Sequence, residues 1–215
     1  MIHALPPATV AGELVRLQTR QHVVALTFDG GGNADAAENV LAVLKREHVA
    51  ATFFLTGHFV RSYPLLARVI GRRYPVGNHT VNHLDLRRLS TGAATREITK
   101  AERLIDSATG RDPRPYFRFP YGARDPRTLG LVRRLGYVSV RWTVDTWGWM
   151  GAARQTASGA TRRVLTHLVP GEIVLMHLGS SRDHSTIDSK ALAGVIRAVR
   201  ARRYRFVTLA GVRAR

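Results

Sequence analysis

Apolar, β-branched runs alternate with helix-like periodicities along almost the whole chain, and this alternation is the feature that most limits its fold. The segment 22–28 predicts a buried strand that stops at Asp29 and three glycines. The segment 35–47 then carries apolar residues at the spacing of one helix face. About seven strand–helix units predict a parallel sheet of the α/β class, which an open doubly wound sheet and a closed barrel both fit.

The other predicted elements continue the same alternation. Strands are expected at 51–55, 75–78, 116–118, 137–142, 172–176 and 205–208, and helices at 63–72, 91–107, 126–135, 161–168 and 189–202. Because no repeat and no linker-like stretch interrupts the pattern, we expect one folded domain at 21–215 after an N-terminal extension at 1–20.

The composition excludes several kinds of site. The absence of cysteine rules out disulfides, thiolate zinc sites and cysteine nucleophiles. No apolar run approaches the roughly 20 residues of a membrane span, and residues 1–10 show no signal-peptide pattern. The net charge of +18 would attract polyanions, although a GC-rich genome, which favours arginine codons, explains the excess equally well. No basic block is interleaved with stacking aromatics, so a nucleic-acid partner is not expected.

Polar residues with catalytic potential follow successive predicted strands. They are Asp29, His79, His83, Arg118, Asp145 and His177. Because the carboxyl ends of parallel strands share one face, we expect these residues to contribute to one site. A single charged residue at a strand end is commonly a helix cap or a loop ion pair, whereas six in succession indicate a functional site.

His79 and His83 are four residues apart, which would place both imidazoles on one face of a helical turn, within reach of one divalent ion. The spacing is a weak signal by itself, and two surface histidines near Asp85 are the simpler explanation. With a carboxylate as third ligand and a water in an open position, the pair would form a hydrolytic centre.

Five short motifs occur in a fixed order along the chain: TFDGG at 27–31, HTVNH at 79–83, RFPYG at 118–122, DTWGW at 145–149 and VLMH at 174–177. By these motifs and their order, the chain resembles the polysaccharide deacetylases of the NodB-homology type, carbohydrate esterase family 4. The resemblance extends from about residue 23 to residue 209. The resemblance implies a distorted, TIM-barrel-like (β/α) barrel of about seven parallel strands. It also implies a metal-dependent hydrolase that removes N-acetyl groups from amino sugars in a glycan.

The resemblance further implies catalytic roles for matching residues. Asp29 would be the general base, Arg118 would orient that aspartate, and His177 would be the general acid that protonates the leaving amine. His79 and His83 would hold one divalent ion, with zinc expected first and cobalt or nickel as alternatives.

The resemblance also implies residues that contact the substrate. The backbone N–H of Tyr121 would stabilise the tetrahedral oxyanion. Trp149 and Leu175 would line the pocket for the acetyl methyl group.

The first departure from the family motifs is Gly30, which stands where T-F-D-D-G has its third metal ligand. Asp35 could swing in as the replacement, Asp29 could itself bind the metal, or the site could bind metal poorly. We favour Asp35, because glycines 30–32 give the loop conformational freedom. An N-cap role for Asp35 in the following helix is an equally good explanation.

The second departure is Gly148, which stands where D-x-x-D-W has its second aspartate. That carboxylate would keep the acid histidine charged, and Asp145 could supply the charge instead, with Asp183 as a remoter candidate. Without such a partner the pKa of His177 would fall, and its acid form would be scarcer near neutral pH. We expect activity, because the other catalytic positions are retained.

The expected substrate is bacterial peptidoglycan first and chitin-type oligomers second. The alternatives are the same chemistry on an O-acetyl ester or a small amide, and a catalytically inactive cell-wall-binding homologue. The basic surface suggests an anionic cell-wall polymer as a further partner, and we expect an extracellular or cell-wall location.

Overall fold

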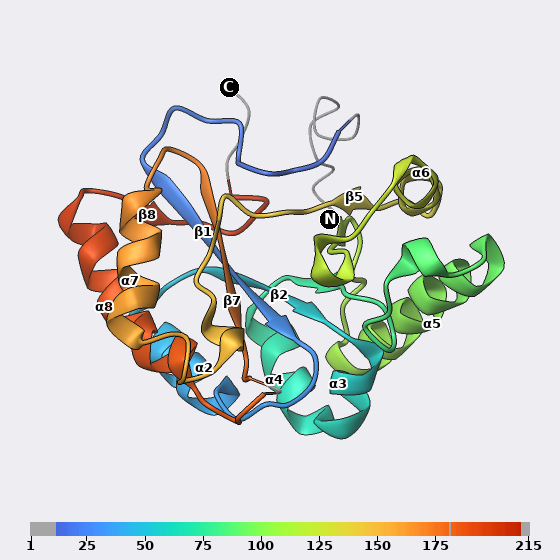
Figure 1. Ribbon diagram of the computed structural model, residues 1–215, viewed down its shortest axis with the longest axis horizontal. Helices are drawn as coiled ribbons and strands as arrows, with labels where there is room; N and C mark the ends of the chain where they lie inside the picture. Colours follow the sequence, from blue (N-terminus) through green and yellow to red (C-terminus); the bar gives the residue numbers. More distant parts are fainter. Residues whose placement is uncertain (1–11, 181, 212–215) are drawn as a thin grey trace. The chain divides into compact units, whose positions relative to one another are not determined.

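The computed structural model describes residues 12–180 and 182–211 (Figure 1). They fall into two compact units. The first unit contains Phe53–Arg141 and the described residues up to Val15, and the second contains Arg16–Thr52 and the described residues from Trp142 onward. Residues 1–11 of the expected N-terminal extension, including residues 1–10 that show no signal-peptide pattern, lie outside the described residues.

The first unit contains a parallel sheet in the order β5–β4–β3–β2. Its strands are β2 (Ala51–Leu55, from Phe53 onward), β3 (Val76–Asn78), β4 (Tyr116–Phe117) and β5 (Val138–Ser139). Gly77 pairs with Phe54, and a Cβ at Gly77 would lie 2.6 Å from the Phe54 ring. The close packing of this ring against β3 therefore requires glycine.

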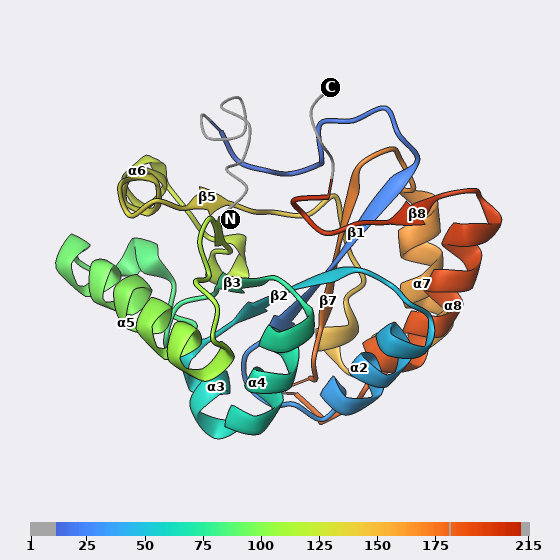
Figure 2. The ribbon, with the colours of Figure 1, turned by 180° about the vertical axis from the view of Figure 1, so that it is seen from behind.

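The described residues of the first unit form four α-helices. They are α3 (Gly57–Ser62), α4 (Pro64–Arg73), α5 (Thr91–Thr109) and α6 (Pro126–Arg134), joined by the 3₁₀ turns η1 (Leu86–Arg88) and η2 (Pro120–Gly122). Three of them, α3, α5 and α6, begin at a side chain that accepts a free backbone N–H. Ser90 caps α5, and Asp125 forms a capping box with Thr128 at α6. Helices α3, α4 and α5 pack on one another (Figure 2). The inner face of α5 adds Ile98 to a buried cluster with Phe117.

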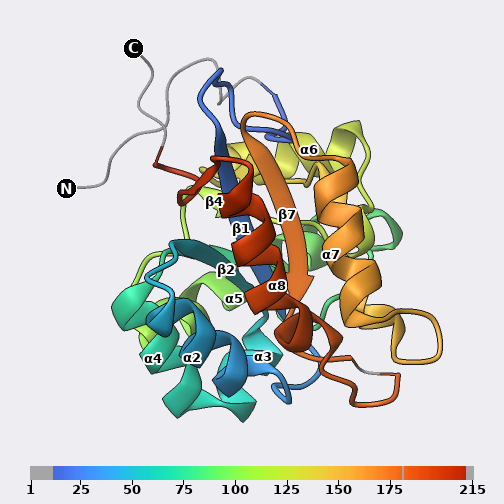
Figure 3. The same ribbon diagram turned by 90° about the vertical axis from the view of Figure 1, so that its left-hand side faces the viewer.

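The second unit contains a parallel sheet in the order β8–β1–β7–β6. Its strands are β1 (Val23–Gly30), β6 (Val144–Asp145), β7 (Glu172–His177) and β8 (Arg205–Phe206), and its helices are α2 (Ala37–Arg46), α7 (Ala157–Thr166) and α8 (Ile187–Ala201). Helix α8 packs against both α2 and α7 (Figure 3). All eight residues of β1 are buried, as its apolar sequence predicts.

The predicted α/β class and the parallel strands are confirmed in both units, but several boundaries differ, and helix α7 begins at Ala157, four residues before the predicted start. Only Val138–Ser139 of the predicted strand 137–142 form a strand (β5, paired with β4), and a separate strand that was not predicted, β6, follows at Val144–Asp145 and pairs with β7. Helix α3 was not predicted. Helix α8 begins at Ile187, two residues before the predicted start, so Asp188 lies in its first turn. No helix of the described residues is long and apolar enough to cross a membrane.

Candidate functional site

His79 and His83 lie together in the first unit, with ring centroids 4.7 Å apart and the rings edge to face. The predicted helical turn is wrong. Residues 79–83 form no helix, and Thr80 and His83 have φ angles of 66° and 58°. Instead, the hydroxyl of Thr80 accepts the backbone N–H of His83 at 3.1 Å, which folds the loop back on itself. The pairing of the rings is thus produced by two left-handed residues.

The protonation pattern of His79 follows from one hydrogen bond. Its Nδ1 lies 2.8 Å from the carbonyl oxygen of Arg118, and its side chain is buried, with 2% of the residue exposed. Because a carbonyl can only accept, Nδ1 carries the hydrogen and Nε2 carries the lone pair. Many metal-binding histidines are oriented in the same way, by a backbone carbonyl that fixes the tautomer.

Glu97 of α5 holds the loop between the two histidines. Its Oε2 accepts the backbone N–H groups of Val81 (3.1 Å) and Asn82 (2.9 Å), and its Oε1 accepts the side-chain amide of Asn82 at 2.7 Å. Sequence analysis missed Glu97, because a glutamate in a long helix carries no signal of a contact with a preceding loop.

Asn78, the last residue of β3, anchors the start of this loop. Its side-chain amide donates to the Ile98 carbonyl (2.9 Å) and to the Tyr137 hydroxyl (3.0 Å), and its side-chain oxygen accepts the N–H of Thr80 (2.9 Å). The residue immediately before His79 is therefore fixed by three buried hydrogen bonds.

Arg118 is fully buried at the end of β4. Its guanidinium donates to the carbonyls of Val140 (3.3 Å) and Arg141 (3.2 Å), and it lies 4.0 Å from the centroid of the Phe54 ring. The buried charge is thus held by backbone dipoles and by an aromatic face.

Tyr121 lies in η2, with a φ angle of 60°, and is 73% exposed. Its ring centroid is 4.6 Å from that of His83. A left-handed tyrosine is unusual, and such residues concentrate at functional sites. The first unit therefore brings together His79, His83 and Tyr121.

In the second unit, the parallel pairing of β1 with β7 sets Asp29 opposite His177. Asp29 is buried, and its carbonyl accepts the N–H of Leu178 at 3.0 Å. His177 is the last residue of β7, as predicted, whereas β1 continues one residue beyond Asp29 to Gly30. Leu175, two residues before His177, is also buried on β7.

His177 is paired with Asp188, a residue that sequence analysis missed. Oδ2 of Asp188 accepts the His177 backbone N–H at 2.8 Å and lies 3.6 Å from Nδ1 of its ring. Burial lowers the pKa of His177, but contact with Asp188 and the charges of Asp29 and Asp145 outweigh it and hold the pKa above its ordinary value. The predicted helix start at 189 left Asp188 outside the helix, so its position next to β7 was not visible.

Asp145 holds the loop that follows β6. Its carboxylate accepts the N–H of Trp147 (2.8 Å) and the indole N–H of Trp149 (3.1 Å), and burial raises its pKa. Its charge reaches His177 electrostatically, while its hydrogen bonds fix the Trp149 ring. Asp183, the remoter candidate for a charge partner of His177, accepts the backbone N–H groups of Ser185 and Ala152.

Asp35 does not cap the helix that follows it. The N-cap of α2 is Ala36, without a side-chain hydrogen bond, so the N-cap explanation for Asp35 is wrong. Oδ2 of Asp35 instead lies 2.8 Å from Nδ1 of His184. The carboxylate is therefore near the surface and already has a partner.

The donor atoms of the histidine pair suit a divalent metal ion, since His79 presents a lone pair on Nε2 beside a second imidazole. Within the part of the chain that the structure describes, there is no group of three or more His, Cys, Asp or Glu side chains placed to hold a metal ion. The histidine pair thus offers two nitrogen donors for a metal ion, and a metal site here would need at least one further ligand.

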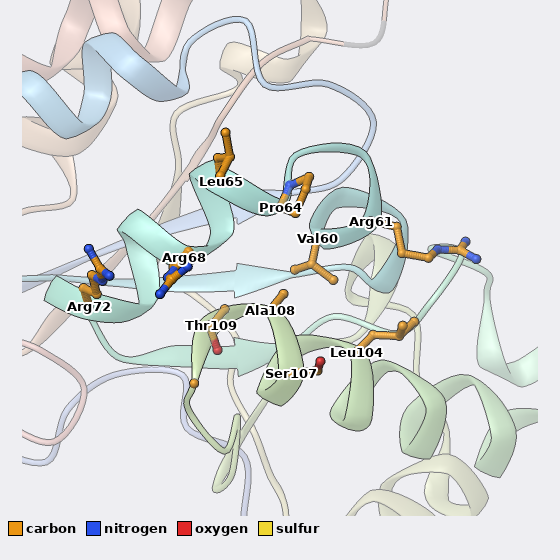
Figure 4. Close-up of a pocket in the computed structure, with 11 residues that line it drawn as sticks. Val60, Arg61, Pro64, Leu65, Arg68, Arg72, Leu104, Ser107, Ala108 and Thr109 are labelled. Atoms are coloured by element: carbon orange, nitrogen blue, oxygen red, sulfur yellow. The ribbon is translucent and has the colours of Figure 1, made fainter.

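A groove of about 720 Å³ lies between α3, α4 and α5 (Figure 4). Arg61, Arg68 and Arg72 line it together with apolar residues such as Leu65 and Leu104. None of the predicted site residues lines this groove.

Comparison with known proteins places the chain among glycan deacetylases. The model of the polysaccharide deacetylase family matches residues 16–140. A peptidoglycan-N-acetylglucosamine deacetylase of Bacillus cereus is 32% identical over 86% of this chain, which spans 66% of that protein's length. Other relatives are named chitooligosaccharide deacetylases.

Solved structures of the same family have the same fold. A peptidoglycan N-acetylglucosamine deacetylase superimposes with a TM-score of 0.84 at 28% identity, covering 96% of this chain and 95% of that one. A carbohydrate esterase family 4 pseudoenzyme from Bacillus anthracis gives 0.82 at 28% identity, covering 94% of this chain and 67% of that one. These matches confirm the expected distorted (β/α) barrel. The chain belongs to the polysaccharide deacetylase family.

Proposed function

We propose that this chain hydrolyses the N-acetyl group of amino sugars in a glycan. The observation that supports this most directly is the histidine pair of the first unit. His79, locked by the Arg118 carbonyl, presents Nε2 beside His83, and the left-handed Tyr121 packs against His83. Such an arrangement is built for a metal-assisted hydrolytic reaction.

The proposed reaction adds water to the acetyl carbon and breaks its bond to nitrogen. Asp29 takes a proton from the attacking water, and the new oxygen–carbon bond gives a tetrahedral oxyanion that accepts a hydrogen bond from the Tyr121 N–H. His177 then donates a proton to the amine as the carbon–nitrogen bond breaks, which leaves acetate and a free amino sugar. Arg118 is proposed to orient the catalytic aspartate.

His79 and His83 are the proposed metal ligands, and Asp35 is the proposed third ligand. A bound divalent ion, zinc first and cobalt or nickel otherwise, would polarise the acetyl carbonyl and lower the pKa of water. Coordination through Asp35 requires its second carboxylate oxygen or release of His184, which binds Oδ2. Trp149 and Leu175 are proposed to line the acetyl pocket, and Asp145 supports this pocket through the Trp149 indole.

Peptidoglycan is the first proposed substrate, because the Bacillus cereus relative is named for it, and chitin-type oligomers are the second. An O-acetyl ester or a small amide is the alternative for the same chemistry. We propose an extracellular or cell-wall location. An anionic wall polymer is proposed as a further partner, supported by the groove of Arg61, Arg68 and Arg72, with which no carboxylate of the described residues pairs.

The test is acetate release from peptidoglycan and from an N-acetylglucosamine oligomer, with protein stripped by EDTA and reloaded with zinc or cobalt. We expect metal-dependent release that is lost in Asp29→Asn and His79→Ala, each by at least about 100-fold. His58→Gln, which changes an exposed histidine of α3, should keep full activity. Zinc bound per chain should fall in His79→Ala and not in His58→Gln.

The inactive-homologue alternative predicts a different result, and the pseudoenzyme similar to this chain makes the comparison necessary. Release of no acetate from any acetylated substrate by protein that contains stoichiometric metal would overturn the proposed function. Full activity of a folded Asp35→Ala variant would overturn only the third-ligand assignment.

A further inference from the structure

Gly148, the first residue of η3 (Gly148–Met150), leaves a space that the Asp188 carboxylate fills. A Cβ on Gly148 would lie 2.3 Å from Cγ of Asp188 and 2.4 Å from each of its carboxylate oxygens. The φ angle of Gly148 is not in the left-handed region, so the backbone itself does not require glycine. A side chain at position 148 is therefore excluded by Asp188.

The same carboxylate holds His177. Asp188 is 3% exposed, accepts the His177 N–H at 2.8 Å, and lies 3.6 Å from Nδ1. The distance to Nδ1 is too long for a hydrogen bond and corresponds to a close ion pair. Nδ1 of His177 and Oδ1 of Asp188 are both buried and have no hydrogen-bond partner among the described residues. The buried imidazole and the buried carboxylate therefore compensate each other electrostatically, through the approach of Nδ1 to Oδ2.

We propose that Asp188 replaces the aspartate that the D-x-x-D-W motif carries at the position of Gly148. In the motif this carboxylate belongs to the loop after β6, whereas here it belongs to the first turn of α8. It occupies the space that a side chain at position 148 would fill. In that position it keeps Nδ1 of His177 toward the carboxylate and leaves Nε2 to donate the proton to the leaving amine. This assignment rests on the proposed function, because it gives the general acid a positioning residue.

The other nearby carboxylates of the second unit have different contacts. Asp145 hydrogen-bonds to Trp147 and Trp149, and Asp29 lies on β1 opposite His177. Their charges act on His177, but the ring of His177 forms its close ion pair with Asp188. Loss of Asp188 should therefore not be compensated by Asp145.

An exchange of positions tests the assignment. Asp188→Asn keeps the shape and an acceptor but removes the charge, so kcat for acetate release should fall about 100-fold with little change in KM. Gly148→Asp alone should be inactive and less stable, because two carboxylates would overlap. The double variant Gly148→Asp/Asp188→Ala should recover to within about tenfold of the wild-type kcat, which a purely structural role of Asp188 would not produce.

Glu38→Gln is the matched control, since it removes an exposed acid from the first turn of α2. Wild-type activity in Asp188→Asn, or failure of the folded double variant to regain activity, would overturn the assignment and leave the proposed function standing. Absence of acetate release from the wild type on every substrate would overturn the proposed function. In that case thermal unfolding tests whether Asp188 takes the place of an aspartate at position 148. The assignment is supported if Asp188→Ala restores the stability lost in Gly148→Asp, and it is refuted if the two variants lose stability additively.

Discussion

At the scale of single residues, hydrogen bonds to groups that can only accept fix the side chains of the candidate site. The Arg118 carbonyl can only accept, so it decides which nitrogen of His79 is protonated. The spacing of the histidines predicted their pairing, but it could not predict how they are paired. That depends on the left-handed Thr80 and on Glu97, which is remote in sequence. Local patterns reveal candidate ligands, whereas the contacts that orient them come from tertiary packing.

Glu97→Gln should weaken metal binding without unfolding the protein. The glutamine oxygen can replace Oε2 and keep the backbone N–H groups of Val81 and Asn82, with the glutamine nitrogen facing the Asn82 side-chain amide, but the three hydrogen bonds lose the negative charge that strengthens them. We expect zinc affinity to fall about 10- to 100-fold, the usual effect of losing a supporting contact. Competition with a zinc chelator measures it. Asp106→Asn removes the same charge from an exposed site on α5 and should keep wild-type affinity; equal affinity in Glu97→Gln would show that the loop needs no such anchor.

At the scale of elements, strand β7 carries an ionisable group at each end. His177 ends the strand beside Asp188, whereas Glu172 begins it in a fully buried position. Burial raises the pKa of Glu172 to about 8, although the N–H of Val169 partly opposes the shift. At neutral pH this carboxyl is therefore largely protonated in the folded chain and ionised in the unfolded chain.

The position of Glu172 predicts that stability falls as pH rises. The pKa is higher in the folded state, so its contribution is complete below about pH 4.5 and is lost as pH rises through about 8. The change amounts to about 3–5 kcal/mol. Urea unfolding between pH 5 and 9 should show this slope in the wild type and a much flatter one in Glu172→Gln. Glu47→Gln, at a surface pair with Arg200, should keep the wild-type slope; an unchanged slope in Glu172→Gln would mean that another group is responsible.

The elements themselves were largely predictable, because the periodicities of β1, β2, α5 and α8 are strong. The boundaries that matter for the site were less so. The apolar run 137–142 gives no sign that β5 ends at Ser139 and that a second short strand, β6, pairs with β7 just before the loop that carries Gly148. The predicted start of α8 lies after Asp188, because the local sequence carries no information about a contact with the distant position 148. The replacement of one aspartate by another is thus visible only in three dimensions.

At the scale of the whole molecule, the net charge of +18 is the property that a polymer substrate would meet first. Arginines are spread over the chain, so the charge alone identifies no surface. The groove between α3, α4 and α5 differs because Arg61, Arg68 and Arg72 all line it, together with apolar side chains. A surface of this kind attracts an extended anion by long-range electrostatic attraction and binds it by direct contacts with the arginine and apolar side chains.

Charge steering predicts that deacetylation of an anionic wall substrate depends on salt, while deacetylation of a neutral chitin-type oligomer does not. The Debye length falls from about 10 Å at 0.1 M to about 3 Å at 1 M, so kcat/KM on peptidoglycan should fall roughly tenfold over that range. The triple change Arg61→Gln, Arg68→Gln and Arg72→Gln should lower kcat/KM on peptidoglycan at low salt and leave the neutral oligomer unaffected. A second triple variant, with Arg20, Arg162 and Arg197 changed to Gln, loses the same charge from exposed positions elsewhere. If both variants lose activity equally, total charge steers the polymer; if neither does, the groove has no part in substrate capture and the arginine excess reflects composition alone.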